Sequence, residues 1–409
     1  MRNSNSIHNS FQNSIRYLRM SDFTGYDPYD GANSGLDLIN KHRLTRLIST
    51  YVNKFSPLNM RRLLRIPKIM QNQSLALIGR AILYEYEIYK KEITRICEKL
   101  ISESLIDKYG YHCWDAHGFQ IQMRSGLREV GMTDVIGNEV IGRFFLELYK
   151  QKPDDRYKEI CISVRDFLLH EYLIEYKNTI FFKYTPAAPE HKWCYNASTI
   201  AAAYCLTVSR YFEIDYDVYS VEKAYRDVIT RQKEGGEWWY SLNLNTGYEK
   251  PQIDFHQGFI LDTLLEYMEY TGYNEPFLNA YKKGLEFYYQ KQFLTTGQGI
   301  YRYPRKYPVN IHNQAQGIIT FTRAAAAGFG EHYVDFARTI AEWTIRNMQD
   351  PDGYFYYLKY PLFTNKIPYI RWSDAAMVYA LAVYLNHTGS SVQDPYNRKY
   401  DRFERSISK

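Results

Sequence analysis

The stretches NASTIAAAYCLTV (196–208) and HNQAQGIITFTRAAAA (312–327) each begin with a polar residue and continue as a helical run of small apolar side chains. Similar runs restart about every 60 residues along the chain. The other restarts lie near Ser74, Gly137, His256 and Trp372. Because one helical hairpin cannot bury its apolar face alone, six such hairpins must pack against one another. We therefore predict an all-α fold, an (α/α)6 toroid of six helical hairpins.

Two kinds of helical segment alternate along the chain. Segments such as EITRICEKLISES (92–104) carry many charges, which is typical of outer helices, whereas 196–208 is apolar enough to be covered on both sides. Apolar residues recur at helical spacing in twelve segments, roughly 36–54, 73–89, 91–106, 133–150, 156–172, 196–212, 217–232, 255–271, 275–292, 312–327, 331–348 and 373–387.

The two ends of the chain lack this pattern. Residues 1–35 are polar and include the turn-rich run YDPYDGANSG (26–35), which indicates a loose extension or a strap across the toroid. Residues 389–409 also show no apolar periodicity. We expect one toroid domain over residues 36–388, with both ends outside its core.

Composition excludes several classes of function. Lys and Arg number 51 against 45 for Asp and Glu, and we expect this excess to be spread along the chain, which argues against a nucleic-acid partner. The five cysteines show no metal-ligand spacing, and their odd number favours reduced thiols in a cytoplasmic protein. No apolar run is long enough to span a membrane or to act as a leader. A P-loop and a GxGxxG motif are absent, so we expect no cofactor and no metal.

The loops indicate which face of the toroid is functional. Connections from outer to inner helices are long and rich in aromatic residues, as in 107–132, 173–195, 233–254 and 349–371, and we predict short β-hairpin lids there. The inner helices begin on this same face, so their partial positive charges favour an anionic ligand. Uronic acids, sulfated sugars and phosphorylated sugars all fit that description.

The strongest catalytic candidates lie at two neighbouring helix starts. Asp254 and His256 stand in IDFHQGF (253–259), and His312 occupies the equivalent place one repeat later. A carboxylate with two imidazoles can perform general acid–base catalysis, because His titrates near neutral pH. The structural alternative is that Asp254 caps its helix while the histidines bond to a loop.

A second candidate cluster opens the last inner helix in KIPYIRWSDAA (366–376). Arg371 can bind a carboxylate in bidentate fashion, Trp372 can stack on a sugar ring, and Asp374 is a further catalytic candidate. The alternative is that Ser373 caps the helix and Asp374 complements its dipole.

Further substrate-binding candidates come from the lids and helix starts, since aromatic rings beside polar groups suit sugar binding. The alternative for each aromatic side chain is packing of its hairpin against the ring. These candidates are Trp114, Asp115, His191, Trp193, Asn196, Glu237, Trp238, Trp239, Tyr301 and Asn313.

Five stretches together resemble a family of stand-alone six-hairpin proteins from bacterial capsule and exopolysaccharide biosynthesis clusters. They are LLRIPKIMQNQSLAL (63–77), DFHQGF (254–259), IHNQAQGIIT (311–320), NMQDPDGYFYY (347–357) and KIPYIRWSDAAMVYAL (366–381). More distantly, the toroid is similar to the helical domain of D-glucuronyl C5-epimerases and to unsaturated glucuronyl hydrolases. The resemblance implies a uronic-acid-containing glycan and contact with polysaccharide assembly proteins.

Two hypotheses follow. The first is a glycan-active enzyme that cleaves or epimerises a uronic-acid-type sugar, with hydrolase, lyase and epimerase all open. A hydrolase requires two carboxylates about 5 to 9.5 Å apart across the pocket, whereas a lyase or epimerase requires a His or Tyr base beside an Arg-bound carboxylate. The second is a non-catalytic glycan-binding or scaffolding protein, which predicts an aromatic groove without converging titratable groups.

Overall fold

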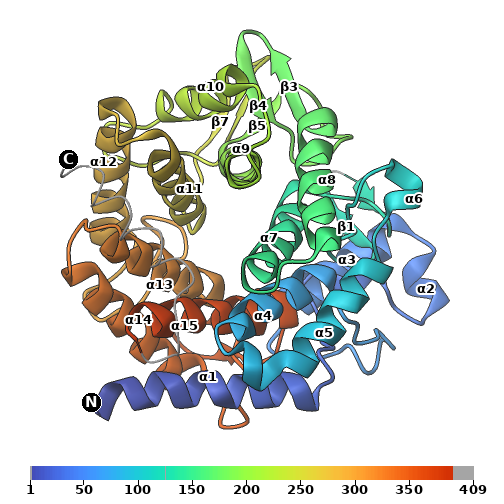
Figure 1. Cartoon of the computed structure of the whole chain (residues 1–409). Helices are drawn as coiled ribbons and strands as arrows, with labels where there is room; N and C mark the ends of the chain where they lie inside the picture. The colour runs from blue at the N-terminus through green and yellow to red at the C-terminus, as the bar shows by residue number, and fades with distance from the viewer. Residues whose placement is uncertain (1, 125, 390–409) are drawn as a thin grey trace.

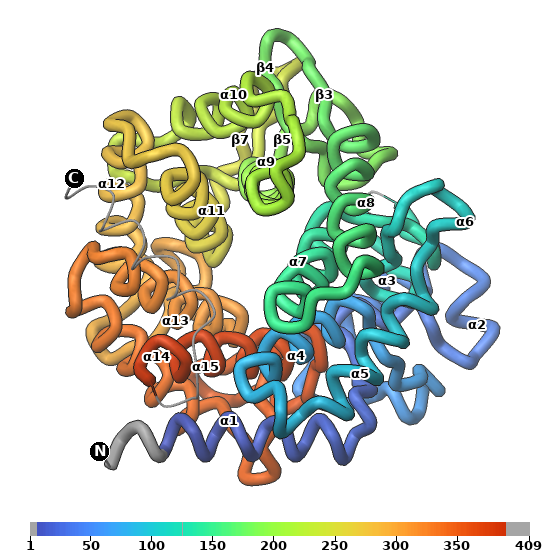
Figure 2. The backbone as a smooth tube through the Cα atoms, viewed as in Figure 1, coloured from blue at the N-terminus to red at the C-terminus, as the bar shows by residue number. Residues whose placement is uncertain are grey.

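Six inner helices form a closed ring in the computed structural model, which describes residues 2–124 and 126–389 (Figures 1 and 2). Each inner helix contacts the next, and the last one, α15, packs on the first, α4. The predicted (α/α)6 toroid is therefore confirmed. The inner helices are α4 (Asn72–Leu83), α7 (Val135–Gln151), α9 (Tyr195–Tyr211), α11 (His256–Thr271), α13 (Ile311–Ala326) and α15 (Ala376–His387).

Small side chains allow the inner helices to approach closely. Ala201, Ala202 and Ala203 of α9 are fully buried, as the composition of this segment predicts. A Cβ atom at Gly142 of α7 would collide with the Tyr204 hydroxyl of α9, so only glycine permits that contact.

Six further helices surround the ring. Five of them are the predicted charged segments, whose apolar stripes face inward while their charges face water. They are α5 (Tyr86–Ser102), α8 (Asp155–Glu171), α10 (Val218–Ile229), α12 (Glu275–Lys291) and α14 (His332–Met348).

The sixth outer helix is α1 (Arg2–Met20), which corrects our expectation that the N-terminal segment lies outside the core. Ile7, Phe11, Ile15 and Leu18 are at most 3% exposed, and α1 packs on α14 and α15 where the ring closes (Figure 1). These four residues are spaced by four, four and three positions, which is a helical stripe hidden in a polar composition. The C-terminal segment 390–409 lies outside the described residues, so the expectation for it stays a prediction.

The segment 36–54 is not an outer helix of the ring, contrary to our prediction. It forms α2 (Asp37–Asn40) and α3 (Arg43–Phe55), and α3 packs on the loop side against η1 (Asp30–Ala32) and strand β1. The physical reason is that α1 already occupies the outer position that closes the ring. The helix α6 (Ile106–Tyr109) is a single turn in the loop before α7.

The long loops form small antiparallel sheets, as predicted for the lids. Two sheets are simple hairpins, and the other two join strands from loops that are distant in sequence. The hairpins are β1 (Ile121–Met123) with β2 (Gly126–Arg128) and β3 (Leu173–Tyr176) with β4 (Thr179–Phe182). One three-stranded sheet consists of β5 (Lys192–Cys194), β6 (Ser241–Asn243) and β7 (Glu249–Lys250). The other consists of β8 (Val309–Asn310), β9 (Leu358–Lys359) and β10 (Thr364–Asn365).

Ion pairs join the inner helices at the middle of α7 and in the C-terminal halves of α4, α7 and α11. Arg143 of α7 donates to Glu266 of α11 at 2.8 Å, although α9 lies between these helices in the ring. Arg80 of α4 pairs with Glu147 of α7 at 2.7 Å. Both pairs are largely buried, where an unpaired charge would be costly. The N-terminal halves of the inner helices, which face the loops, are left to form the candidate site.

We predict that Phe11→Ala lowers the free energy of unfolding by about 3 kcal/mol, because it leaves a cavity under α1 at the ring closure. Urea denaturation checks this value. Met20→Ala is the matched control, since that side chain is 82% exposed at the end of the same helix. Equal stability of the two variants would show that α1 does not hold the ring.

Candidate active site

The N-terminal ends of α11 and α13 and the π-helix η2 (Ile370–Ala375) bring four aromatic rings together. Phe255 lies at the centre, with its ring centroid 4.3 Å from that of His256 and 4.7 Å from that of His312. Trp372 completes the group, 4.9 Å from His312 and 6.1 Å from Phe255. We call Phe255, His256, His312 and Trp372 the aromatic cluster. Three of its members were predicted from sequence, and Phe255 was not.

Asp254 and His256 form a carboxylate–imidazole pair at the start of α11. Nδ1 of His256 contacts Oδ1 of Asp254, and Gln252 donates to Oδ2 at 2.7 Å. Burial acts to raise the pKa of Asp254, but the imidazole and these hydrogen bonds outweigh it and lower that pKa. An ionised Asp254 orients the ring of His256, whose side chain is 18% exposed. Nε2 is then the ring nitrogen left for proton transfer.

His312 is held in its neutral form. Burial lowers its pKa to about 4, and the positive charge of Arg371 acts in the same direction. Its Nδ1 atom is buried and has no hydrogen-bond partner within the described part of the chain. A neutral imidazole can donate one hydrogen bond and accept one, and the backbone of Trp372 is a partner for this ring.

Arg371 binds the chain's own carboxylate. Its Nε donates to Oδ2 of Asp27 at 2.9 Å, so the predicted role of Arg371 as the clamp for a ligand carboxylate is already partly filled. Arg302 is the more accessible guanidinium, because its side chain is 49% exposed and its Nε lies 3.6 Å from Oδ2 of Asp254. Tyr301, a predicted ligand contact, has its ring 5.3 Å from that guanidinium.

The N-terminal segment supplies site residues that sequence analysis missed. The Tyr29 ring lies 5.9 Å from Trp372, and its hydroxyl accepts from Lys54 of α3 at 2.5 Å. Burial lowers the pKa of Lys54 to about 8. The run YDPYDGANSG was the sequence signal for these site residues. It follows directly after the apolar stripe of α1, which fixes this part of the chain to the ring. Of our two readings of that run, a loose extension or a strap across the toroid, these contacts fit the strap.

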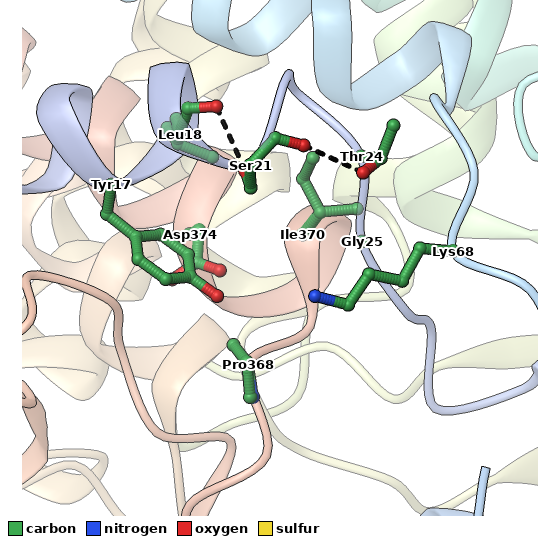
Figure 3. Close-up of a pocket in the computed structure, with 9 residues that line it drawn as sticks. All are labelled: Tyr17, Leu18, Ser21, Thr24, Gly25, Lys68, Pro368, Ile370 and Asp374. Carbon is green, nitrogen blue, oxygen red and sulfur yellow. Dashed lines mark hydrogen bonds between the residues drawn. The ribbon is translucent and has the colours of Figure 1, made fainter. Parts of the chain in front are cut away.

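Asp374 lies in a different place from the aromatic cluster. Figure 3 shows its carboxyl group beside the Tyr17 ring of α1, in a cavity of about 10 Å³ also lined by Pro368 and Ile370. Its Oδ1 accepts from the backbone N–H of Phe355 at 2.8 Å, and burial raises its pKa to about 8. Asp374 therefore fixes the loop before η2, inside the π-helix instead of at a helix cap, and we leave it out of the proposed chemistry.

Three predicted sugar-stacking tryptophans are core residues. Trp114, Trp193 and Trp238 are fully buried, so none can contact a ligand. The indole of Trp114 donates to Leu100 O at 2.6 Å, and that of Trp238 donates to Val228 O at 2.9 Å. The packing alternative holds for all three, because each fastens a loop to the ring. Trp239 is half-buried and lies 4.5 Å from the ammonium group of Lys233.

Asp115, His191 and Asn196 have structural contacts. Asp115 pairs with Arg128 at 3.0 Å and accepts from the N–H of Gly131 at 2.8 Å, which fixes the loop after β2. The carbonyl of His191 accepts from Leu244 N beside the β5–β6 pair, and Asn196 Oδ1 accepts from Cys194 Sγ at 3.1 Å.

Asn313 and Glu237 complete the set of predicted residues. Asn313 accepts from Phe255 N at 3.2 Å and donates to Ile300 O at 2.6 Å, so it positions the central ring of the cluster. Glu237 is half-buried in the loop before β6, and its Oε2 has no hydrogen-bond partner among the described residues.

Two general features bear on the chemistry. Within residues 2–124 and 126–389, no group of three or more His, Cys, Asp or Glu side chains is arranged to hold a metal ion. The helices of that same part of the chain include none whose length and apolar character would suffice to cross a bilayer.

Comparison with known proteins places the chain by fold. No protein-family model matches the sequence, and neither does any curated protein. The structure is similar to an unsaturated glucuronyl hydrolase from a Bacillus species, with 10% identity, a TM-score of 0.63, and coverage of 93% of this chain and 95% of that one. It is also similar to a cellobiose 2-epimerase from Bacillus thermoamylovorans (12% identity, TM-score 0.62, coverage 78% and 89%). An α-mannanase of glycoside hydrolase family 76 from Bacteroides thetaiotaomicron matches as well (11% identity, TM-score 0.59, coverage 78% of this chain and 86% of that one).

These likenesses confirm the six-hairpin fold and the distant similarity to unsaturated glucuronyl hydrolases that the sequence indicated. At such identities they establish the fold alone, because one fold hosts many reactions.

We predict that Asp374→Asn raises stability at alkaline pH. The native pKa of about 8 lies above the unfolded value near 4, so stability is lost as pH rises toward 8. An amide keeps the hydrogen bond from Phe355 and cannot ionise, which should remove a loss of up to about 5 kcal/mol. Urea unfolding between pH 5 and 9 tests this, with the exposed Asp352→Asn as control. A variant less stable than wild type at pH 9 would contradict the buried, protonated state.

We predict that His312→Gln removes part of the acid sensitivity of the fold. The native pKa near 4 lies below the unfolded value near 6.5, so wild-type stability falls as pH decreases through this window. The decrease in the free energy of unfolding should be smaller in the variant than in wild type, by up to about 3 kcal/mol. Unfolding at pH 7 and pH 4.5 measures the difference, and His191→Gln, in the β5 loop, serves as control. Identical slopes for all three proteins would exclude a neutral buried His312.

Proposed function

We propose that this protein is a carbohydrate-active enzyme that epimerises an anionic, uronic-acid-type sugar by proton transfer at carbon. The observation that carries the proposal is the convergence of Asp254, His256 and His312 around Phe255 at the loop face of the toroid. A scaffold or binding protein requires no such convergence of titratable groups. Neighbours in fold that act on sugars support the substrate class.

Positive charge supports an anionic substrate. Arg302, Lys250 and Arg371 are grouped with the N-terminal ends of α11 and α13 around the aromatic cluster. Of these side chains, Arg302 is exposed and can bind a sugar carboxylate in bidentate fashion.

The carboxylates favour proton transfer over hydrolysis. A glycosidase needs two carboxyl groups facing one another across the sugar. Here Asp254 is engaged by His256, Asp27 is engaged by Arg371, and Asp374 lies beside α1. His256 with its orienting carboxylate, Asp254, is instead a pair that suits proton transfer.

A mechanism follows from these contacts. His256 takes the proton from the carbon next to the sugar carboxylate, and Asp254 stabilises the imidazolium that forms. Arg302 and the neutral His312 stabilise the negative charge that moves onto the carboxylate oxygens. Water on the opposite face of the carbon returns a proton to it, which gives the epimer, and His256 passes the proton that it took to the hydroxide that is left. Loss of the substituent on the neighbouring carbon from the same intermediate would give a lyase product instead.

We predict that glucuronate- and mannuronate-containing oligosaccharides incubated with the protein in D2O acquire deuterium at C5. His256→Gln and Asp254→Asn should lower the exchange rate by about 10² to 10⁴. NMR follows the label, absorbance at the ultraviolet band of an unsaturated uronate detects elimination, and reducing-end assays detect hydrolysis.

His332→Gln, at the exposed start of the outer helix α14, is the matched control and should exchange at the wild-type rate. Bond cleavage without deuterium incorporation would assign a hydrolase. Absence of exchange, cleavage and elimination across the uronate panel, together with measurable binding, would favour the glycan-binding or scaffolding role in polysaccharide assembly.

A further inference from the structure

The helix α3 is amphipathic with its apolar side turned outward. Its buried residues are the polar Ser49, Thr50 and Asn53, held by bonds such as Ser49 Oγ to Gly31 O at 2.6 Å and Tyr369 OH to Asn53 O at 2.9 Å. These bonds fix the rotation of the helix. The large apolar side chains therefore cannot turn toward the ring.

Five large apolar residues stand on the exposed side at helical spacing, and we call them the α3 stripe. They are Leu44, Ile48, Tyr51, Val52 and Phe55, with exposures from 67% for Leu44 to 38% for Tyr51. Successive members are separated by four, three, one and three positions, so they follow one face of the helix. An exposed apolar surface of this size marks an interaction site.

The segment that contains the α3 stripe is rich in basic residues. Residues 36–68 contain eight basic residues and one acidic residue, Asp37, a formal charge of +7 in a chain whose net charge is +6. Our expectation that the basic excess is spread along the sequence was therefore wrong. Arg61 is buried against Asp30, whereas Lys41 and Arg43 are exposed at the start of α3 and Arg62 is exposed in the segment that follows it.

Neighbouring hairpins extend the same surface. Arg43 donates to Arg124 O at 2.6 Å, and Arg124 lies 5.7 Å from the Tyr51 ring, which places the exposed Arg124, the residue after β1, beside the stripe. The side chain of Asn365 on β10 donates to Ser56 O at 3.1 Å, at the end of α3. The surface is thus an outward helix face bordered by β1 and, at the C-terminal end of α3, by β10.

We propose that α3 binds the surface of a membrane rich in anionic phospholipid, with the α3 stripe inserted between headgroups. Charge complementarity selects this partner, because the exposed Lys41, Arg43 and Arg124 near the stripe match a negative surface. A helix that lies flat on the protein with its apolar face outward also suits a bilayer surface, whereas a protein partner helix is normally received in a groove. The inference is independent of the proposed reaction.

This surface adjoins the candidate active site. Lys54 of α3 is bonded to Tyr29, whose ring lies against Trp372 of the aromatic cluster. A membrane bound at α3 therefore lies next to the mouth of the site. A glycan attached to a lipid, or a polymer close to the bilayer, would be within reach of the loops.

Co-sedimentation of the purified full chain with vesicles tests the proposal without any activity assay. We expect binding to phosphatidylcholine vesicles that contain about 30 mol% phosphatidylglycerol, at least about tenfold stronger than to phosphatidylcholine alone, and weaker at high salt. The paired variant Ile48→Gln and Val52→Gln should lose about tenfold in binding, because it removes inserted apolar surface. Lys41→Glu with Arg62→Glu should abolish the preference for anionic lipid.

The matched control is Ile88→Gln with Val218→Gln, which changes two exposed apolar residues on outer helices far from α3 in sequence and should bind as wild type does. Equal thermal stability of the Ile48 and Val52 variant excludes misfolding as the cause of lost binding. Wild-type protein that ignores both kinds of vesicle, or binds equally after loss of the stripe, would overturn the proposal. Self-association that disappears in the stripe variant, seen by analytical ultracentrifugation without vesicle binding, would assign the surface to a second copy of the chain.

Discussion

Closure of the ring is the constraint on which the rest of the structure depends. Each inner helix is apolar on most of its surface and needs neighbours on both sides, so a row of hairpins would leave two unburied ends. The contact of α15 with α4 removes those ends, and α1 covers the seam between α14 and α5. The segment after α1 then has to pass over the loop face. That route brings Asp27 to Arg371 and Tyr29 to Trp372.

The same closed ring gives three titratable groups different environments. Asp254 is buried but bonded to His256 and Gln252, so it remains ionised. His312 is buried near Arg371 and is neutral, and Asp374 accepts a single backbone hydrogen bond and stays protonated at neutral pH. Two carboxylates and an imidazole therefore differ in charge because of their surroundings alone. For Asp254 and His312, which lie at the aromatic cluster, such separation of protonation states suits proton-transfer chemistry.

Polar residues at the loop face hold the site in place. Asn313 fixes the backbone of Phe255, and Phe255 in turn sets the spacing between His256 and His312. The buried tryptophans anchor their loops to the ring from below. The site thus combines a rigid floor with a rim that carries the exposed Arg302 and the half-buried Lys54 of α3.

The sequence by itself determined the repeat, the alternation of inner and outer helices, and the grouping of Asp254, His256, His312 and Trp372 at helix starts. These are local properties, because apolar periodicity and position within a repeat are written in consecutive residues. Tertiary structure alone decided that the polar N-terminal segment closes the ring, that Trp114, Trp193 and Trp238 are core, and that Asp374 faces α1. It also decided that α3 turns its apolar side to solvent. Each of these outcomes depends on contacts between helices and loops that are far apart in the sequence. An apolar stripe that becomes buried and one that stays exposed have the same spacing in the sequence.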